Sequence, residues 1–270
     1  MYYFRADGSA KTGAGHLMRC LTVALELQKL TEHPEQVCFL CADEASAELL
    51  RSNHMPVKVL ETDPEDLEGE LPVLERLAGD TKQIFLVDSY RVTDAYLREL
   101  RRLGRVFLLD DMQQHAYPVD GVINYNLFAS AEKYRELYGD TVPQYLGAPY
   151  VPVRQQFCDA SGSYAVAEQV TDVLITDYSS VVFEASLLDI PMLMYAYDLE
   201  RYISSRGFYY EYEDMAPGKI VRTYSDLVTA IEQQDFENDK LQEFKKRFFD
   251  DLDGRSTVRA GELIVECTKK

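Results

Sequence analysis

Short apolar runs alternate with amphipathic segments along the first half of the chain. This pattern is typical of a parallel sheet with both faces covered by helices. The apolar runs predict strands at residues 1–7, 37–42, 57–60, 83–88 and 105–111. One helical stripe of apolar residues starts just after Gly15, and further helices are expected at residues 45–53, 72–77 and 94–102. We therefore expect a Rossmann-like lobe over residues 1–150.

The alternation breaks over residues 151–164, where prolines and small polar residues predict a connection between two lobes. Beyond it, apolar runs predict three strands, at residues 172–177, 191–196 and 219–223. Helices are expected after Ser179, from Tyr224 and over the charged tail at residues 239–252, which could pack across the first lobe or mediate a dimer. Residues 165–270 thus predict a second, shortened lobe, and the oligomeric state stays open.

The charge of the chain excludes some partners. Twenty-eight basic against forty-six acidic residues give a net charge of −18, so nucleic acid and anionic membrane surfaces would be repelled. The sequence contains no leader-like start and no apolar run near the roughly 20 residues that span a bilayer, so we expect a cytoplasmic protein without an integral membrane segment. A phosphate-bearing ligand would need local donors.

Cysteine and histidine spacing predicts no disulfide framework, metal site or cofactor. Five cysteines are an odd number, and Cys38 and Cys41 lie in an apolar run that is typical of a buried strand. The four histidines are scattered and have no metal-ligand spacing.

The stretch "RADGSAKTGAGHLMRC", residues 5–20, combines a glycine turn with a histidine at a helix start. Backbone N–H groups at such a turn can bind phosphate, and the positive helix end keeps an imidazole neutral. We therefore expect His16 to act as a general base beside a phosphate or sugar. The phosphate or sugar contacts expected here are Arg5, Asp7, Lys11, Gly13, Gly15 and Arg19.

Two alternatives remain for this turn. His16 could simply hydrogen-bond a backbone group. The turn could also belong to a dinucleotide site supported by Asp43, although Met18 stands where the third glycine of that fingerprint is expected.

Polar residues follow the predicted strands at the edge where open α/β sheets bind ligands. We expect phosphate or sugar contacts from Asp88, Tyr90, Asp111 and Asn126, with Asp110 as a neighbouring candidate. Turn formation or loop capping is the alternative for each of them.

The first half also resembles a known family. "RADGSAKTGAGHLMRCLTVALEL", and later "LVDSY", "LLDDMQQHAYPVDGVINYNL" and "YLGAPYVPVRQQF", resemble the PseG family over residues 1–157. These are the UDP-2,4-diacetamido-2,4,6-trideoxy-β-L-altropyranose hydrolases of pseudaminic acid synthesis. The resemblance implies a GT-B-like fold and water attack at the anomeric carbon of a UDP-sugar, with the base at His16.

A second candidate site lies in "TDVLITDYSSVVFEASLLDIPMLMYAYD", residues 171–198. After the strand that ends at Asp177, Ser179 and Ser180 can cap a helix and offer donors to a diphosphate. Glu184 lies one turn further along and could reach a ribose hydroxyl. An ordinary capped helix is the alternative.

This stretch, continued by "YDLERYISSRGFYYEYEDMAPGKIV" and "GRSTVRAGELIV", resembles the C-terminal part of the CDP-glycerol glycerophosphotransferases of teichoic acid synthesis over residues 165–267. The resemblance implies a lobe that binds CDP through Asp177, Ser179 and Ser180. That family's catalytic histidines lie upstream of the matching part, which contains none of the chain's histidines.

The sequence therefore predicts a mosaic of two GT-B-like lobes that acts on a small nucleotide-linked substrate. The main hypothesis is a hydrolase of a UDP-linked amino-sugar in cell-surface glycan precursor synthesis, with His16 as base. The alternatives are a CDP-glycerol glycerophosphotransferase and a non-catalytic chimeric protein.

Overall fold

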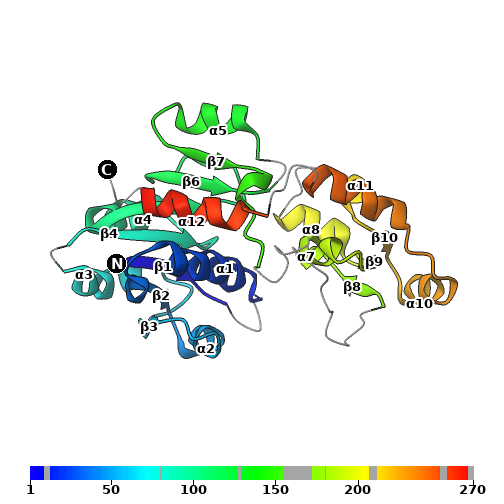
Figure 1. Ribbon diagram of the computed structural model, residues 1–270, viewed down its shortest axis with the longest axis horizontal. Coiled ribbons are helices and arrows are strands. Elements are labelled where there is room, and N and C mark those ends of the chain that lie inside the picture. Colours follow the sequence, from blue (N-terminus) through cyan, green and yellow to red (C-terminus); the bar gives the residue numbers. More distant parts are fainter. Residues whose placement is uncertain are drawn as a thin grey trace. The chain divides into compact units, whose positions relative to one another are not determined.

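A computed structural model describes residues 1–8, 13–79, 81–126, 129–154, 172–179, 181–206, 212–249 and 254–266. The chain divides into two compact units. Unit 1 contains residues 1–154 and 255–270, and unit 2 contains residues 155–254. Each unit has its own parallel sheet (Figure 1). The expected α/β class, with a smaller second sheet, is confirmed.

Unit 1 is built on a seven-stranded sheet of order β3-β2-β1-β4-β5-β6-β7, parallel throughout. The strands are β1 (Tyr2–Ala6), β2 (Val37–Cys41), β3 (Val57–Val59), β4 (Gln83–Asp88), β5 (Gly104–Leu109), β6 (Gly121–Asn124) and β7 (Gln144–Leu146). The first five are the five strands expected from the apolar runs. The apolar runs predict no strand at β6 or β7, which are four and three residues long.

Three helices of unit 1, α2 (Glu44–Ser52), α4 (Asp94–Leu103) and α5 (Ala131–Tyr138), begin at a side-chain cap. Asp43 accepts the Ser46 amide at the start of α2, and Thr93 does the same for Tyr96 at the start of α4. The other helices of this unit before the connection are α1 (Gly15–Leu30) and α3 (Leu71–Ala78). Asp43 is thus used as a helix cap, which leaves the dinucleotide alternative without its acidic residue.

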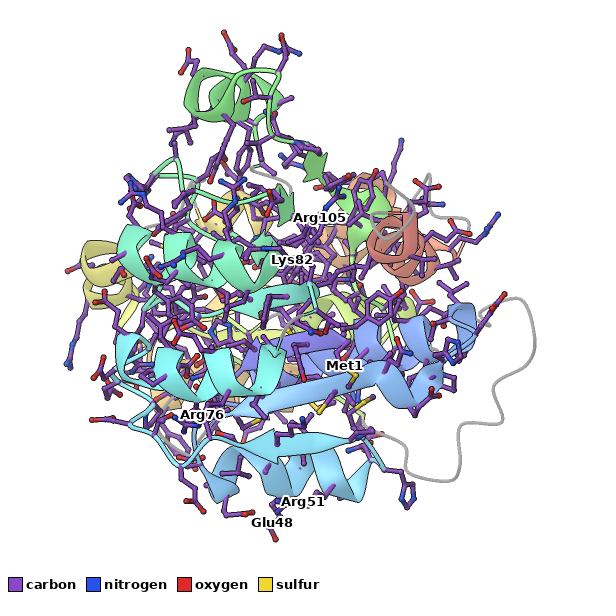
Figure 2. All side chains as sticks on the ribbon, turned by 90° about the vertical axis from the view of Figure 1, so that its left-hand side faces the viewer. Met1, Glu48, Arg51, Arg76, Lys82 and Arg105 are labelled. Atoms are coloured by element: carbon purple, nitrogen blue, oxygen red, sulfur yellow. The ribbon has the colours of Figure 1, made fainter. Side chains whose placement is uncertain are left out.

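The central strands of unit 1 are buried on both faces, as expected of a parallel sheet between helices, whereas the edge strands β3 and β7 are only partly buried. All residues of β1, β2 and β4 are buried, Cys38 and Cys41 among them, and both of these thiols are free. Figure 2 looks onto the amino-terminal side of this sheet, where the labelled Met1, Lys82 and Arg105 lie at or next to the starts of neighbouring strands. The carboxyl ends lie at the opposite edge.

Unit 2 has a three-stranded parallel sheet of order β10-β9-β8. Its strands are β8 (Leu174–Thr176), β9 (Met192–Tyr195) and β10 (Lys219–Val221), at the three expected places. Its helices are α7 (Val181–Leu187), α8 (Leu199–Arg206), α9 (Tyr212–Met215), α10 (Tyr224–Gln233) and α11 (Asn238–Phe249). The charged tail helix is α11, and Phe244 and Phe248 on it pack against Phe183 of α7 within this unit.

The final described helix, α12 (Ser256–Glu266), belongs to unit 1 and not to the second lobe in which the sequence analysis placed it. It packs along α1, where a Cβ on Gly261 would lie 2.8 Å from Leu30 Cδ1 (Figure 1). The buried Thr257 hydroxyl donates to the Val153 carbonyl at 2.7 Å and accepts from the Val153 amide at 2.9 Å. The pattern of apolar residues could not predict these contacts, because they join segments that are far apart in the sequence. Most of the expected connection, residues 155–164, lies outside the described residues.

Candidate functional site

The residues expected at the strand ends of unit 1 do meet at one edge of the sheet. Asp88 ends β4, Asp111 follows β5 and Asn126 follows β6, while His16 and Arg19 approach from the first turns of α1. The carboxyl ends of neighbouring parallel strands share one edge, so side chains far apart in sequence come together there. We call this group, with Tyr90 and Tyr125, the His16 cluster.

Asp88 is the buried centre of the His16 cluster. Its side chain is 1% exposed, and its Oδ1 lies 2.6 Å from His16 Nδ1. Arg19 donates to both carboxylate oxygens at 2.5 Å, from Nε to Oδ2 and from Nη2 to Oδ1. Burial by itself would raise the pKa of Asp88, but Arg19 and His16 lower it to about 2. Asp88 is therefore ionised at neutral pH.

Arg19 connects Asp88 to Asp111 and Tyr125. Its Nη1 lies 2.7 Å from Asp111 Oδ2 and donates to the Tyr125 hydroxyl at 2.9 Å. Burial alone would lower the pKa of Arg19, whereas Asp111 and Asp88 raise it well above the ordinary value. The guanidinium is thus fixed between two carboxylates, which leaves it less available to a ligand phosphate than the sequence analysis expected.

The outer part of the cluster is built around Asp111. Asn126 Nδ2 donates to Asp111 Oδ1 at 3.1 Å, and the Tyr90 hydroxyl donates to Oδ2 at 3.1 Å. The Tyr90 ring meets the His16 ring edge-on with centroids 4.7 Å apart, yet the residue is 53% exposed. Burial and the nearby Asp111 raise the pKa of Tyr90 above its ordinary value. Tyr90 is therefore the member of the cluster most accessible to a ligand, and it lies directly against the His16 ring.

Arg5 does not join the cluster. Its side chain is fully buried and pairs with Glu70 through Nη2 at 2.7 Å and with Asp7 through Nη1 at 2.5 Å. Asp7 also accepts the Ala42 amide at 2.8 Å, and Tyr96 donates to Glu70 at 2.6 Å. The expectation that Arg5 contacts a phosphate is therefore wrong. Its guanidinium pairs with carboxylates in the interior, where a phosphate has no access. Asp7 is one of the groups that neutralise the Arg5 charge.

The glycine turn itself is partly described. Gly13 has a φ of 79°, the left-handed conformation that favours glycine, whereas a Cβ on Gly15 would meet no atom within 4 Å. No side chain of the described residues caps the first amides of α1, the groups that bind anions at a helix start. Lys11 lies outside the described residues.

Asp110, the neighbouring candidate, has a structural role. Its side chain accepts the Met112 and Gln113 amides at 2.9 and 3.2 Å and the Tyr134 hydroxyl at 2.8 Å. The residue is 4% exposed, so it supports the turn after β5 as the capping alternative predicts.

In unit 2 the predicted nucleotide residues follow β8. Ser179 Oγ accepts the Val181 amide at 3.3 Å at the start of α7, and Glu184 lies on that helix. The backbone carbonyl of Asp177 accepts the Tyr212 hydroxyl at 3.0 Å, while Asp177 and Ser179 are themselves exposed. Ser180 lies outside the described residues. Their nucleotide role stays a prediction.

Sequence reasoning missed the aromatic residues beside this stretch. Tyr178 stacks on Tyr202 with centroids 4.0 Å apart and meets Tyr212 edge-on at 5.3 Å. Its hydroxyl donates to Asp198 at 3.0 Å. Burial and Asp198 raise the pKa of Tyr178 above its ordinary value. The tyrosines are 24 to 34 residues from Tyr178 in sequence, so only the many tyrosines of this segment could have hinted at the group.

The described residues provide neither a metal-ligand group nor a membrane-spanning helix. They contain no group of three His, Cys, Asp or Glu side chains that could hold a metal ion. None of the helices described is both long and apolar enough to cross a membrane.

Comparison with known proteins shows that one part of the chain is similar to a known family. Residues 154–266 match the family CDP-Glycerol:Poly(glycerophosphate) glycerophosphotransferase. This agrees with the second resemblance in the sequence. The match starts beyond the His16 cluster, so it leaves the hydrolase resemblance of residues 1–157 as an expectation.

Curated relatives give the same picture. A teichoic acid poly(ribitol-phosphate) polymerase of Bacillus spizizenii is 45% identical over 96 residues, which are 36% of this chain and 16% of that protein. A teichoic acid ribitol-phosphate polymerase of Staphylococcus aureus is 42% identical over 108 residues, 39% of this chain and 19% of that protein. The matching part therefore spans less than a fifth of the length of these two relatives.

A solved structure of the wall teichoic acid polymerase TagF aligns with 86% of this chain and 56% of its own, with 22% identity and a TM-score of 0.30. This overall likeness is too weak to support an inference.

Proposed function

We propose that the chain is a polyol phosphate transferase of the teichoic acid type, whose residues 154–266 bind a CDP-linked polyol. The observation that carries this proposal is the match of those residues to the glycerophosphotransferase family. The two relatives described above are both polymerases of teichoic acid. These findings favour the transferase, which was the alternative, over the UDP-amino-sugar hydrolase that was the main hypothesis.

In this reaction an acceptor hydroxyl attacks the phosphorus that carries the polyol. A new P–O bond forms, the bond between the two phosphates breaks, and CMP leaves. Ser179 and Ser180 would hold the diphosphate, with Asp177 beside them and Glu184 toward the ribose. The acceptor proton needs a base, and His16, which lies outside the matched segment, is the residue that the sequence predicts for that role.

The His16–Asp88 contact of 2.6 Å favours a second candidate function. A histidine held by a buried carboxylate can equally take a proton from water. The chain would then hydrolyse a nucleotide-sugar at the anomeric carbon and release the nucleoside diphosphate. The two reactions differ in their products, CMP against UDP.

The direct test is a product assay on the purified full chain. CDP-glycerol or CDP-ribitol is supplied with a polyol phosphate oligomer, and released nucleotides are separated by chromatography. We expect CMP release that requires the acceptor. His16→Ala should slow it by about 10²–10⁴-fold, the usual range for loss of a general base.

His33→Ala is the matched control, because His33 lies at the surface beside Glu35, 3.2 Å away, and should leave the rate unchanged. UDP release from a UDP-amino-sugar, without turnover of either CDP compound, would replace the transferase by the hydrolase. Absence of turnover with both substrate classes would contradict both.

A further inference from the structure

The surroundings of Asp88 give it a role different from the ligand contact expected of it. Its carboxylate is 1% exposed and is occupied by His16 and Arg19, and Cys20 Sγ lies 3.6 Å from Oδ2. A carboxylate enclosed in this way cannot touch a substrate at the surface. Any influence on chemistry must pass through His16 or Arg19.

The contacts at His16 Nδ1 determine which ring nitrogen carries the proton of the neutral imidazole. Asp88 Oδ1 lies 2.6 Å away and can only accept, whereas Arg19 Nη2 lies 3.1 Å away and can only donate. Both cannot be hydrogen bonds to one nitrogen. The carboxylate contact is shorter, and the same Arg19 nitrogen already donates to Asp88 Oδ1 at 2.5 Å. The proton therefore belongs on Nδ1.

A proton on Nδ1 leaves the lone pair on Nε2. A base needs that lone pair on the nitrogen that faces its substrate. The edge-on Tyr90 ring, 4.7 Å from the His16 ring, further restricts rotation of the imidazole. The arrangement thus fixes both the tautomer and the orientation of the ring.

We propose that Asp88 is a positioning residue that holds His16 as the Nδ1–H tautomer with the lone pair on Nε2, and that Arg19 keeps Asp88 in place. Arg19 is then a structural partner of Asp88 and Asp111 and not a phosphate ligand. This inference rests on the proposed role of His16 as a base. It applies to either nucleophile, an acceptor hydroxyl or water.

The test reads the tautomer directly and needs no substrate. The full chain is labelled with ¹⁵N-histidine, and long-range ¹H–¹⁵N correlations are recorded at a pH at which the His16 ring is neutral. The signals of His16 are assigned by their loss in His16→Ala. We expect His16 to show a protonated Nδ1 and an unprotonated Nε2. An Nε2–H signal in the unmodified chain would overturn the proposal without any variant.

Asp88→Asn gives the second measurement. Its amide oxygen should stay with Arg19 Nε, and its NH₂ then replaces Oδ1. His16 Nδ1 would face two donors, this NH₂ and Arg19 Nη2, which reverses the tautomer to Nε2–H. The His33 signals in the same spectrum are the internal control, and Tyr90→Phe, which keeps the ring against His16, should retain the Nδ1–H form. An Asp88→Asn chain that folds and keeps His16 as Nδ1–H would overturn the proposal.

Kinetics separate this inference from the proposed function. In whichever reaction the chain catalyses, Asp88→Asn should lower kcat by about 10²-fold or more with little change in KM, because a transition-state interaction is lost. A kcat equal to that of the unmodified chain would contradict the positioning role. If neither substrate class is turned over, the proposed function fails while the tautomer measurement still decides the role of Asp88.

Discussion

The two sheets of this protein place different chemistry at their carboxyl ends. In unit 1 the edge is ionic, with the buried Asp88 and the partly buried Arg19 at its centre and His16 beside them. In unit 2 the edge is aromatic, with Tyr178 packed between Tyr202 and Tyr212. Geometry suggests a mechanism for the first edge, whereas similarity to known proteins suggests a ligand for the second.

The difference extends to stability. Unit 1 contains a second buried ionic group, in which the Arg5 and Glu70 side chains are both fully buried. The ion pairs of the described part of unit 2 lie at the surface; in the pair of Arg222 with Glu213 both side chains are 52% exposed. Buried charges depend strongly on their partners, while surface pairs contribute little. Substitutions at matched pairs should therefore have very different effects in the two units.

The largest effect is expected from Glu70→Ala. It leaves Arg5 charged and buried without its main partner, which should destabilise unit 1 by about 3–5 kcal/mol. Denaturant unfolding followed by circular dichroism measures the change. Glu213→Ala, which breaks a surface pair of unit 2, is the matched control and should scarcely move the midpoint. Equal shifts in the two variants would remove the contrast between the units.

Thr257→Val should have the next largest effect. The valine keeps the shape but removes the hydroxyl that bonds both the amide and the carbonyl of Val153. A buried backbone group left without a partner costs about 1–3 kcal/mol. Thermal unfolding measures the loss, and Thr229→Val on the exposed face of α10 is the control. An unchanged melting temperature would mean that α12 contributes nothing to unit 1 through this contact.

Asp88 should make stability depend on acid pH. Its folded pKa of about 2 lies below the ordinary value of 3.8. A lowered folded pKa stabilises the protein above the unfolded pKa, and this contribution is lost as pH falls from about 4 to 2. The contribution is about 2 kcal/mol, and it should be missing in Asp88→Asn. Urea unfolding at several pH values measures both chains; identical pH profiles would contradict the assignment.

The smallest effect is expected in unit 2. Tyr178→Phe removes the hydroxyl that donates to Asp198 and keeps the ring between its two neighbours. A hydrogen bond of this kind contributes about 0.5–1.5 kcal/mol. Tyr178→Ala should cost more, since the stacking is lost as well. If the Phe variant is as unstable as the Ala variant in thermal unfolding, the hydroxyl and not the stacked ring holds this edge together.

Much of the fold was predictable because local signals were strong. Continuous apolar runs marked the five strands β1 to β5, and the glycine turn before an apolar stripe marked α1. The strands β6 and β7 were not predicted; they belong to the sheet through pairing with β5 and with each other, which the pattern of apolar residues does not report. The sequence did not predict that α12 packs in unit 1, because this packing depends on contacts between segments about a hundred residues apart.

The sequence by itself determined that polar residues follow the strands and that His16 starts a helix, because parallel topology brings strand ends to one edge. It also carried the resemblance of residues 165–267 that the family match supports. Only the tertiary structure decided how the charges are used. Arg5 and Arg19 are both cations near a glycine turn in the sequence. In the structure Arg5 pairs with the buried Glu70, whereas Arg19 pairs with Asp88 beside His16. Burial and partners set the role of a charged side chain, and both arise from residues distant in sequence.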